Sequence, residues 1–361
     1  MLPPRRYVLR AIAYPAVLGG ILFAMKTQDR FADITPYWEK LEEVRALEPD
    51  VLFLGSSRTL RHLDPVRLDS LRGDGAVSYN FGLPGSRSLE THFRTDHLLV
   101  MDLPVRRMVV EFGPVAVAVP KRLRGTRRVQ HHHDARRAMI GSRVALAADR
   151  PVVHRVRSAA ARWRFWTTNT FLVGWGRAWT NAVVTEQDDA PPASVGRRGH
   201  VPLRDDGNAE RSVRREQFLT PEGQAEFERR LGALRLRETV VPTARDRVTA
   251  DAWIALAERG RARGVEMVFV EQVGTEKGAG VTQLVREALG TESVIVLNDP
   301  QRYPELFDGD AWFDEGHLGQ EMALRATDIL AAELPPLPPG SARLGAETVT
   351  EAEGGRPPET R

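Results

Sequence analysis

Two adjacent serines follow a short apolar run near the beginning of the chain. Residues 51–58 read Val-Leu-Phe-Leu-Gly-Ser-Ser-Arg, and a stretch compatible with a helix comes next. If the apolar run is a buried strand, a serine hydroxyl lies at the carboxyl edge of a sheet, beside the first free N–H groups of a helix. A serine placed there is suited to nucleophilic catalysis with an oxyanion site. The alternative is that Ser56 and Ser57 only cap the helix.

A serine nucleophile needs a base, and the base needs an acid that orients it. Among the nine histidines, His317 comes three residues after Asp314 in Trp-Phe-Asp-Glu-Gly-His-Leu-Gly, residues 312–319. This spacing lets a carboxylate on a tight turn accept a hydrogen bond from the imidazole. The segment follows the last expected strand, so it reaches the same sheet edge as Ser57. The sequence predicts a triad of Ser57, His317 and Asp314; the alternative is that Asp314 caps the final helix.

The other histidines and the composition predict no second reactive centre. His131–His133 are consecutive and point in different directions on a helix, so we do not expect a shared metal site. His62, one helical turn after Arg58, is expected on a helix surface. The chain contains no cysteine, which excludes thiolate nucleophiles, disulfides and cysteine-based zinc sites. We therefore expect neither a metal nor another cofactor.

Five short apolar segments alternate with helical patterns and must position these residues. The expected strands are Val51–Leu54, Ala76–Phe81, Val105–Phe112, Val265–Val270 and Val294–Leu297. The expected helices include residues 59–71, with a break at Asp64-Pro65, and residues 88–101, 247–263, 281–289 and 319–334. This alternation predicts an α/β fold, a three-layer α/β/α flavodoxin-like sandwich with about five parallel strands.

The ends of the chain differ from this α/β pattern. Arg5 and Arg6 precede an apolar stretch, Tyr7–Met25, and no Ala-x-Ala-like cleavage site follows it before Lys26. Residues 1–30 are therefore expected to form an uncleaved signal anchor, a single transmembrane helix with the remaining chain outside the cytoplasm. A buried or amphipathic N-terminal helix is the alternative. Residues 335–361, rich in Pro, Gly and Glu, are expected to be a disordered tail.

A long segment interrupts the alternation, so residues 31–119 and 246–334 form the expected α/β domain and residues 120–245 an insertion. The insertion begins with a basic part, Lys121–Arg164, holding 13 Lys/Arg against two Asp. Its aromatic residues are Trp163, Phe165, Trp166, Phe171, Trp175 and Trp179. We consider three roles for this mainly helical segment: contact with anionic lipid, a platform for a glycan or partner, or a solvated subdomain.

The overall composition is that of a globular protein. Of 361 residues, 42% are hydrophobic and 27% charged, which is enough to bury a sizeable core. The net charge is only +3, so there is no global signature of nucleic-acid binding, and no nucleic-acid partner is expected.

With these residues in view, the sequence resembles the SGNH, or GDSL-type, hydrolase superfamily. Phe53-Leu-Gly-Ser-Ser57 is similar to its first block, with Ser57 in the nucleophile position and Ser56 replacing the usual aspartate. Residues 80–85, Asn-Phe-Gly-Leu-Pro-Gly, resemble the second block, which implies that the Gly85 N–H joins the oxyanion hole and places Asn80 near the substrate. Asp314 and His317 match the last block. The resemblance covers about residues 50–118 and 246–333.

The third block departs from the family. Residues 109–116 read Val-Val-Glu-Phe-Gly-Pro-Val-Ala, and Val115 stands where the family has an asparagine that donates to the oxyanion. Losing one such donor costs on the order of 100–1000-fold in turnover. Arg58 is a candidate replacement. Without a replacement, the reaction is slow or selective, or the site is not catalytic.

The resemblance implies a membrane-anchored, extracytoplasmic serine esterase or O-acyltransferase acting on acyl esters of a cell-envelope glycan or polymer. Relatives in this divergent branch often work beside a membrane-bound O-acyltransferase, which is thus a candidate partner. The alternative is a catalytically impaired module that keeps the fold to bind a glycan or that membrane partner.

Overall fold

The computed structural model describes residues 17, 35–120, 127–171, 197–203, 209–235, 240–275 and 278–338. The expected signal anchor, residues 1–30, lies outside the described residues except for residue 17, and the expected tail lies outside them beyond residue 338. Trp175 and Trp179 of the aromatic group also lie outside them. Within the described residues, no helix combines the length and the apolar character that crossing a membrane requires.

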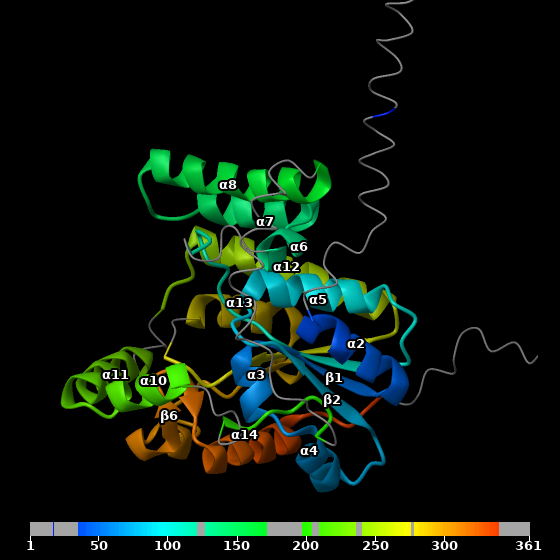
Figure 1. Ribbon diagram of the computed structural model, residues 1–361, viewed down its shortest axis with the longest axis vertical. Coiled ribbons are helices and arrows are strands. Elements are labelled where there is room, and N and C mark those ends of the chain that lie inside the picture. Colours follow the sequence, from blue (N-terminus) through cyan, green and yellow to red (C-terminus); the bar gives the residue numbers. More distant parts are fainter. Residues whose placement is uncertain are drawn as a thin grey trace, which may run out of the picture.

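A five-stranded parallel sheet forms the centre of the molecule (Figure 1). Its strands lie in the order β2-β1-β3-β4-β5, which is the order of doubly wound α/β sheets of the flavodoxin type. The α/β class and the parallel sheet predicted from the sequence are confirmed. The strands are β1 (Val51–Gly55), β2 (Ser78–Gly82), β3 (Arg107–Glu111), β4 (Glu266–Glu271) and β5 (Val294–Val296).

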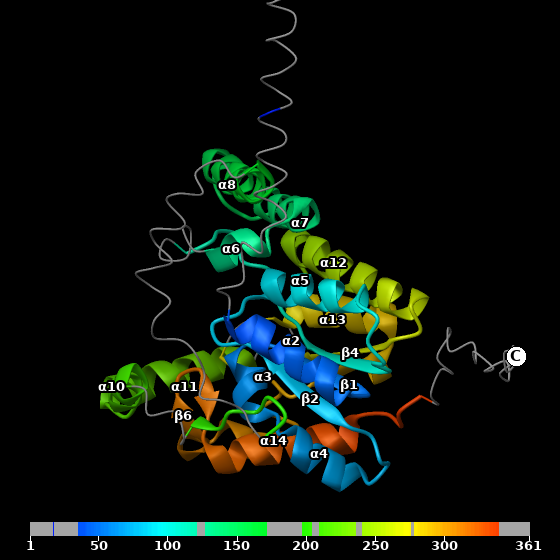
Figure 2. The same cartoon turned by 45° about the vertical axis from the view of Figure 1, so that its right-hand side comes forward.

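Helices cover both faces of this sheet and bury two separate apolar cores. Figures 1 and 2 show α5 and α12 on one side of the strands, and α4 and α14 on the other. Tyr37, Trp253 and Val285 belong to the first core. The helices on its side are α2 (Thr35–Leu47), α5 (Ser88–Leu99), α12 (Ala244–Ala262) and α13 (Ala279–Leu289).

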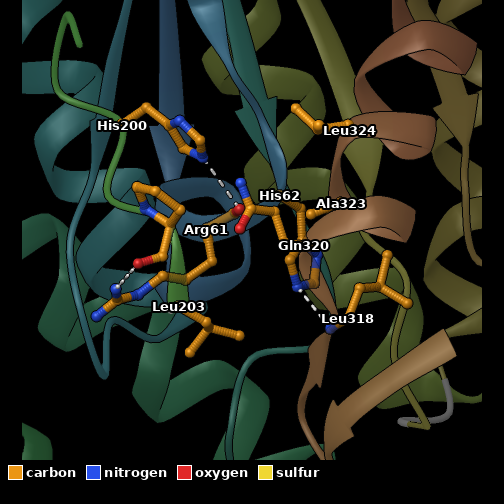
Figure 3. A pocket seen from close by; sticks show the side chains of 9 residues that line it. Arg61, His62, His200, Leu203, Leu318, Gln320, Ala323 and Leu324 are labelled. Carbon is orange, nitrogen blue, oxygen red and sulfur yellow. Dashed lines mark hydrogen bonds between the residues drawn. The ribbon is translucent and has the colours of Figure 1, made fainter. Parts of the chain in front are cut away.

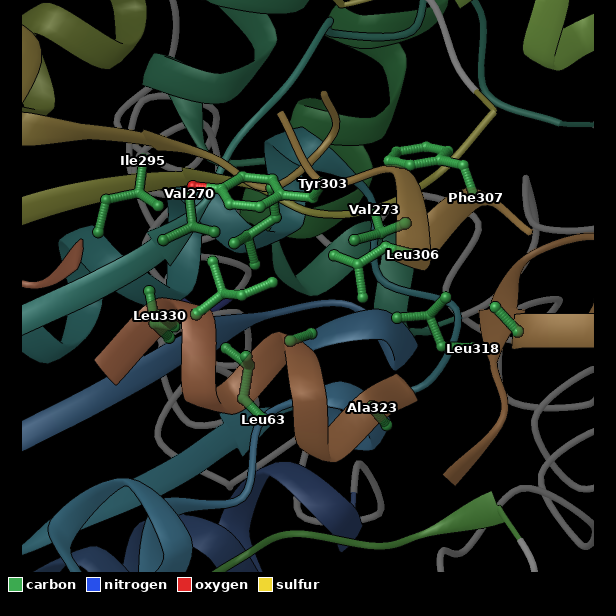
Figure 4. Close-up of a cluster of buried hydrophobic side chains, with 14 of the residues drawn as sticks. Leu63, Val270, Val273, Ile295, Tyr303, Leu306, Phe307, Leu318, Ala323 and Leu330 are labelled. Atoms are coloured by element: carbon green, nitrogen blue, oxygen red, sulfur yellow. The ribbon is translucent and has the colours of Figure 1, made fainter. Parts of the chain in front are cut away.

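The second core lies under α4 (Pro65–Arg72) and α14 (Gln320–Glu333). Figure 4 shows Val270 and Ile295 of the sheet facing Leu330 of α14. Two short 3-10 turns line its edge, η5 (Pro304–Phe307) and η6 (Gly309–Ala311), while η4 (Thr291–Ser293) precedes β5 and contacts α13. Burial on both faces explains why the strands read as continuous apolar runs instead of alternating patterns.

The helices of residues 120–245 lie in two places. One group is α6 (Arg127–His131), α7 (Ala135–Leu146) and α8 (Val152–Phe171), with α7 next to α12 and α8 packed on α7. The other group is α10 (Ala209–Phe218) and α11 (Pro221–Arg235). Phe227 and Leu231 of α11 are buried in the second core of the sheet. This later part of the segment therefore shares the core of the α/β domain.

Two local features decide where Ser57 and His317 lie. The helix expected at residues 59–71 is split into α3 (Ser57–His62) and α4, since the Asp64 carboxylate accepts from Val66 N and Arg67 N and starts α4. Near the other end of the chain, β6 (Trp312–Asp314) and β7 (His317–Leu318) form a small antiparallel hairpin. The sequence did not predict this hairpin. The final helix begins at Gln320 with Gly319 as its cap residue, so Asp314 does not cap it.

Candidate active site

The two serines after β1 have different roles. Ser56 is the cap residue of α3, and its Oγ accepts a hydrogen bond from Arg58 N at 3.1 Å. Ser57 is the first residue of that helix, so its own N–H has no partner within the helix. Gly55 before them must be a glycine, because a Cβ there would lie 1.9 Å from Thr59 Oγ1. The capping alternative therefore applies to Ser56 and leaves the Ser57 hydroxyl available.

A carboxylate at the end of the neighbouring strand holds this turn in place. Glu111 closes β3, and its two oxygens accept from Ser56 N at 2.6 Å, Ser56 Oγ at 2.7 Å and Thr59 Oγ1 at 2.7 Å. All three donors belong to the turn that presents Ser57. The sequence reasoning missed Glu111, although an acidic residue that ends an apolar strand at the ligand-binding edge is a usable signal.

The structure brings Ser57, His317 and Asp314 together. The Nε2 atom of His317 lies 2.9 Å from Ser57 Oγ. Its Nδ1 atom lies 2.9 Å and 3.1 Å from the two oxygens of Asp314. Because the carboxylate is an acceptor, Nδ1 carries the proton and Nε2 presents its lone pair to the serine hydroxyl. This is the arrangement in which an imidazole can remove the serine proton.

The β6–β7 hairpin fixes the acid and the base relative to each other. Asp314 and His317 are paired across the hairpin, and Gly316 N donates to Asp314 Oδ1 at 2.8 Å. The Asp314 side chain is only 2% exposed. Burial acts to raise the pKa of Asp314, but the hydrogen bond and charge of His317 outweigh it, and the pKa lies below its usual value. The orienting carboxylate is therefore ionised at neutral pH.

His62 lies in the interior next to this hairpin, so the expectation of a surface histidine was wrong. Its side chain is fully buried, and its Nε2 accepts from Leu318 N at 3.0 Å (Figure 3). The rings of His62 and His317 are 6.2 Å apart. Burial, followed by the charge of His317, holds the pKa of His62 well below its usual value. A neutral His62 can accept the Leu318 N–H bond, which attaches the hairpin to the helix that carries Ser57.

A small cavity beside His62 is not the substrate site. It is lined by Arg61, His62, His200 and apolar residues around Leu318 (Figure 3). Its volume is about 10 Å³, which is room for about one water molecule. Neither Ser57 nor His317 lines it. Ser57 instead follows β1 at the carboxyl edge of the sheet, where ligands of α/β proteins bind.

The loop after β2 lies beside the Ser57 turn. Strands β1 and β2 pair in register up to Gly55 and Gly82, and Leu83 N donates to Gly55 O at 3.1 Å. Gly85 in this loop is exposed and has a φ of +64°, a backbone conformation that favours glycine. Pairing of the two strands thus brings the predicted oxyanion loop to the same edge as the serine.

Asn80 does not have the substrate-side role that the resemblance implied. Its Nδ2 donates to Thr59 O and to Leu63 O, both at 2.7 Å, and its Oδ1 accepts from Gly82 N at 2.9 Å. Both amide protons are therefore used within the fold, and none remains for an oxyanion. Asn80 fastens α3 to β2 and so positions the helix that carries Ser57.

Arg58 extends toward the loop after β4. A Cβ added to Gly274 would lie 2.7 Å from Arg58 Nη1, so the guanidinium lies directly against this glycine. Gln272, two residues before it, is 2% exposed, and its amide nitrogen and oxygen have no hydrogen-bond partner among the described residues. A buried amide without partners costs free energy, so Gln272 is a polar group at this edge that the sequence reasoning missed.

Val115, at the position of the missing asparagine, is part of an apolar core. It is 2% exposed and clusters with Leu89 of α5 and with Ile140 and Val144 of α7. The loop is fixed on its other side, where Trp253 Nε1 donates to Gly113 O at 3.1 Å. The third block therefore offers no side-chain donor from this position.

The described residues contain no group of three or more His, Asp or Glu side chains arranged to hold a metal ion. Within the consecutive histidines, His133 contacts Val129 O through Nδ1 and Arg162 through Nε2, so it takes part in packing the insertion. Comparisons with protein-family models, curated proteins and solved structures gave no match to this chain.

Proposed function

We propose that this protein is a serine esterase or O-acyltransferase of the SGNH type. It would act on acyl esters of a cell-envelope glycan or polymer. The observation that carries this proposal is the unbroken contact series from Ser57 Oγ through His317 to Asp314. Further support comes from the sheet order and from the positions of the serine turn and the hairpin at one sheet edge.

The geometry supports a two-step acyl transfer. His317 Nε2 takes the Ser57 proton as Oγ attacks the acyl carbonyl, and it then protonates the departing alcohol oxygen. The acyl group remains on Ser57 as an ester. In the second step His317 removes a proton from water or from a sugar hydroxyl, whose oxygen attacks this ester. The bond between the acyl carbon and Ser57 Oγ breaks, and His317 returns the proton to Oγ. Water makes the protein an esterase, and a sugar hydroxyl makes it a transferase.

The oxyanion would be held by backbone groups. Ser57 N–H begins α3, and Gly85 N–H lies in the neighbouring loop. The asparagine that would add a donor is replaced by the buried Val115. Loss of one donor lowers turnover on the order of 100–1000-fold. We therefore propose a slow or selective enzyme, with Arg58 and Gln272 as groups that contact the substrate from the β4 side.

The proposed location is extracytoplasmic, with the chain held at the membrane by its N-terminal segment. This rests on the sequence alone: Arg5 and Arg6 followed by the apolar stretch of residues 7–25. Such a location suits an envelope polymer as substrate and a membrane-bound O-acyltransferase as partner.

Hydrolysis of 4-nitrophenyl acetate tests the proposal. The wild-type chain is expected to release nitrophenol, and Ser57→Ala is expected to lower the rate of release at least about 1000-fold. Ser56→Ala is the matched control: it removes a hydroxyl that caps α3 and donates to Glu111 but does not contact His317, so a much smaller loss is expected. If an oligosaccharide is added as acceptor and becomes acetylated, the protein is a transferase. Full activity of Ser57→Ala would rule out this mechanism.

The second candidate function is a binding or assembly module without turnover. The buried Val115 favours it, because the residue at the donor position has become part of the core. On this alternative, the folded wild-type chain binds an envelope glycan but neither cleaves nor transfers its acyl groups.

A further inference from the structure

The outer face of α8 carries a continuous apolar stripe. Val153, Val156, Ala160 and Trp163 follow one another at intervals of three and four residues, which places them on one side of the helix. Val153 is 71% exposed, Val156 53% and Trp163 42%. The opposite side of α8 is buried, with Ala159, Arg162 and Phe165 facing inward. Exposed apolar residues in a row indicate a surface that another body covers.

The two helices of this hairpin are strongly basic. Together α7 and α8 contain seven arginines and no acidic residue. Arg136 and Arg137 of α7 pair with Asp96, and Arg162 of α8 is buried. Arg157 and Arg164 of α8 are exposed and form no ion pair with a carboxylate of the described residues. The apolar stripe is therefore flanked by positive charge that no carboxylate of the described residues neutralises.

The stripe lies at one extreme of the molecule. In Figures 1 and 2, α8 is the outermost of the labelled helices on this side, and α4 and α14 lie at the opposite end. Near the start of α2, Tyr37 and Trp38 have their rings 5.7 Å and 6.4 Å from that of His131 in α6. The start of α2 therefore lies beside the α6–α8 group.

We propose that the outer face of α8 docks on the surface of an anionic lipid bilayer. Apolar residues with an indole between arginines are the composition of helices that lie in the membrane interface. Clustered arginines strengthen contact with acidic headgroups. A second copy of the chain fits this face less well, because pairing two such helices would bring their arginines together. The inference rests on the membrane location in the proposed function and adds the surface that faces the lipid.

Single-cysteine labelling tests this docking, since the natural chain has no cysteine. The full-length chain with Val153→Cys is labelled with the environment-sensitive dye NBD. The matched control is Leu71→Cys on α4, which is 52% exposed and lies at the opposite end. Each protein is mixed with vesicles of equal parts phosphatidylglycerol and phosphatidylcholine, or of phosphatidylcholine alone. Vesicle flotation measures attachment of the chain separately from the dye signal.

Docking predicts that NBD at position 153 brightens and shifts to shorter wavelength with the anionic vesicles, and less with phosphatidylcholine alone. NBD at position 71 should stay unchanged. The double variant Arg157→Glu/Arg164→Glu should lose most of the response, and the exposed Arg261→Glu on α12 should keep it. High salt should weaken the response, because exposed charges are screened.

Three results would overturn the docking. The dye at position 153 could behave like the dye at position 71 although the chain floats with the vesicles. It could respond equally to both lipids, or change with protein concentration in the absence of vesicles, which identifies self-association. Labelling of Ser57 by a fluorophosphonate in the same samples reports separately on the proposed esterase chemistry, so the two proposals can fail independently.

Discussion

The Ser57 turn and the Gly113–Val115 loop follow adjacent strands of one sheet, yet they are built in opposite ways. Around Ser57, polar groups form a series of hydrogen bonds. Glu111 accepts from the turn that presents Ser57, the Ser57 hydroxyl contacts His317, and His317 contacts Asp314. In the loop after β3, Val115 is packed among apolar side chains of α5 and α7. The region around Ser57 has the side chains that activating a serine requires, whereas the loop after β3 packs against α7 of the insertion.

The difference separates two requirements of the proposed hydrolase chemistry, activation of the serine and stabilisation of the oxyanion. Activating the serine needs a few side chains in fixed hydrogen bonds, and these are present. Stabilising the oxyanion needs donors aimed at a position that is empty in the ground state. The loop that could add a donor is instead used for packing, so the contrast predicts a reactive serine with modest turnover.

The largest expected effect comes from breaking the acid–base pair. Asp314→Asn replaces the acceptor of the His317 Nδ1 proton with a group that can favour the wrong tautomer. We expect kcat for ester cleavage to fall on the order of 10⁴-fold, with the fold retained. Steady-state kinetics with circular dichroism as a control measure this. A change below tenfold would show that the hairpin does not orient a catalytic base.

The same variant has a signature in stability against pH. The pKa of Asp314 in the folded chain lies below its unfolded value, so ionised Asp314 stabilises the fold above about pH 4. That contribution is lost as the pH falls through the lowered pKa. The difference in unfolding free energy between wild type and Asp314→Asn should therefore shrink in acid. A difference that stays constant with pH would contradict the assigned ionisation.

The next largest effect is expected from removing the Glu111 carboxylate, which holds the turn that presents Ser57. Glu111→Ala leaves the donors of Ser56 and Thr59 without their acceptor. We expect a loss of about 3 kcal/mol in unfolding free energy, measured by urea denaturation. Glu111→Gln is the matched control, because it keeps the shape and one acceptor oxygen. Equal losses in both variants would mean that the charged carboxylate is required, and no loss in either would remove the role given to Glu111.

His62 connects the two halves of the triad. His62→Leu removes the acceptor of Leu318 N, so the hairpin can shift relative to Ser57. A displacement of about 1 Å at a reacting group lowers the rate on the order of 100-fold. The expected loss is in kcat with little change in KM. His62→Gln supplies an amide oxygen as acceptor and should recover much of the rate; the two variants behaving alike would exclude a positioning role.

The smallest effect is expected in the apolar loop after β3, at Val115. Val115→Asn introduces the asparagine that the SGNH superfamily has in its third block, but the side chain at this position is surrounded by Leu89, Ile140 and Val144. We expect a stability loss of about 2 kcal/mol and no gain in ester cleavage, because a buried amide there lacks partners. A rise of about 100-fold in kcat with unchanged stability would show that this position still faces the oxyanion.

A residue's role could be predicted from the sequence where it depends on neighbouring residues in the chain, and not where it depends on packing between distant elements. The strands and the Ser57, Asp314 and His317 positions follow from apolar runs and motif spacing, which the chain carries locally. That Glu111 ends an apolar strand is visible in the sequence, but its partners and the burial of His62 depend on which elements become neighbours, and no spacing encodes that. Asn80 matched a motif, yet its amide is used by backbone groups of α3.

The β6–β7 hairpin escaped prediction for a different reason. Its strands are three and two residues long, too short for a periodic signal. The division of residues 120–245 between two sides of the sheet is also a tertiary matter. In sequence α11 looks like its polar neighbours, and only the packed structure shows that Phe227 and Leu231 complete the second core.

The most direct test of the central claim is covalent labelling of the serine. The folded wild-type chain is treated with a fluorophosphonate probe, and mass spectrometry of its peptides locates the adduct. We expect a single adduct on Ser57, lost in Ser57→Ala and retained in Ser56→Ala, because of these two serines only Ser57 contacts His317. No adduct on folded wild-type protein, or an adduct that persists in Ser57→Ala, would contradict an activated serine at this position.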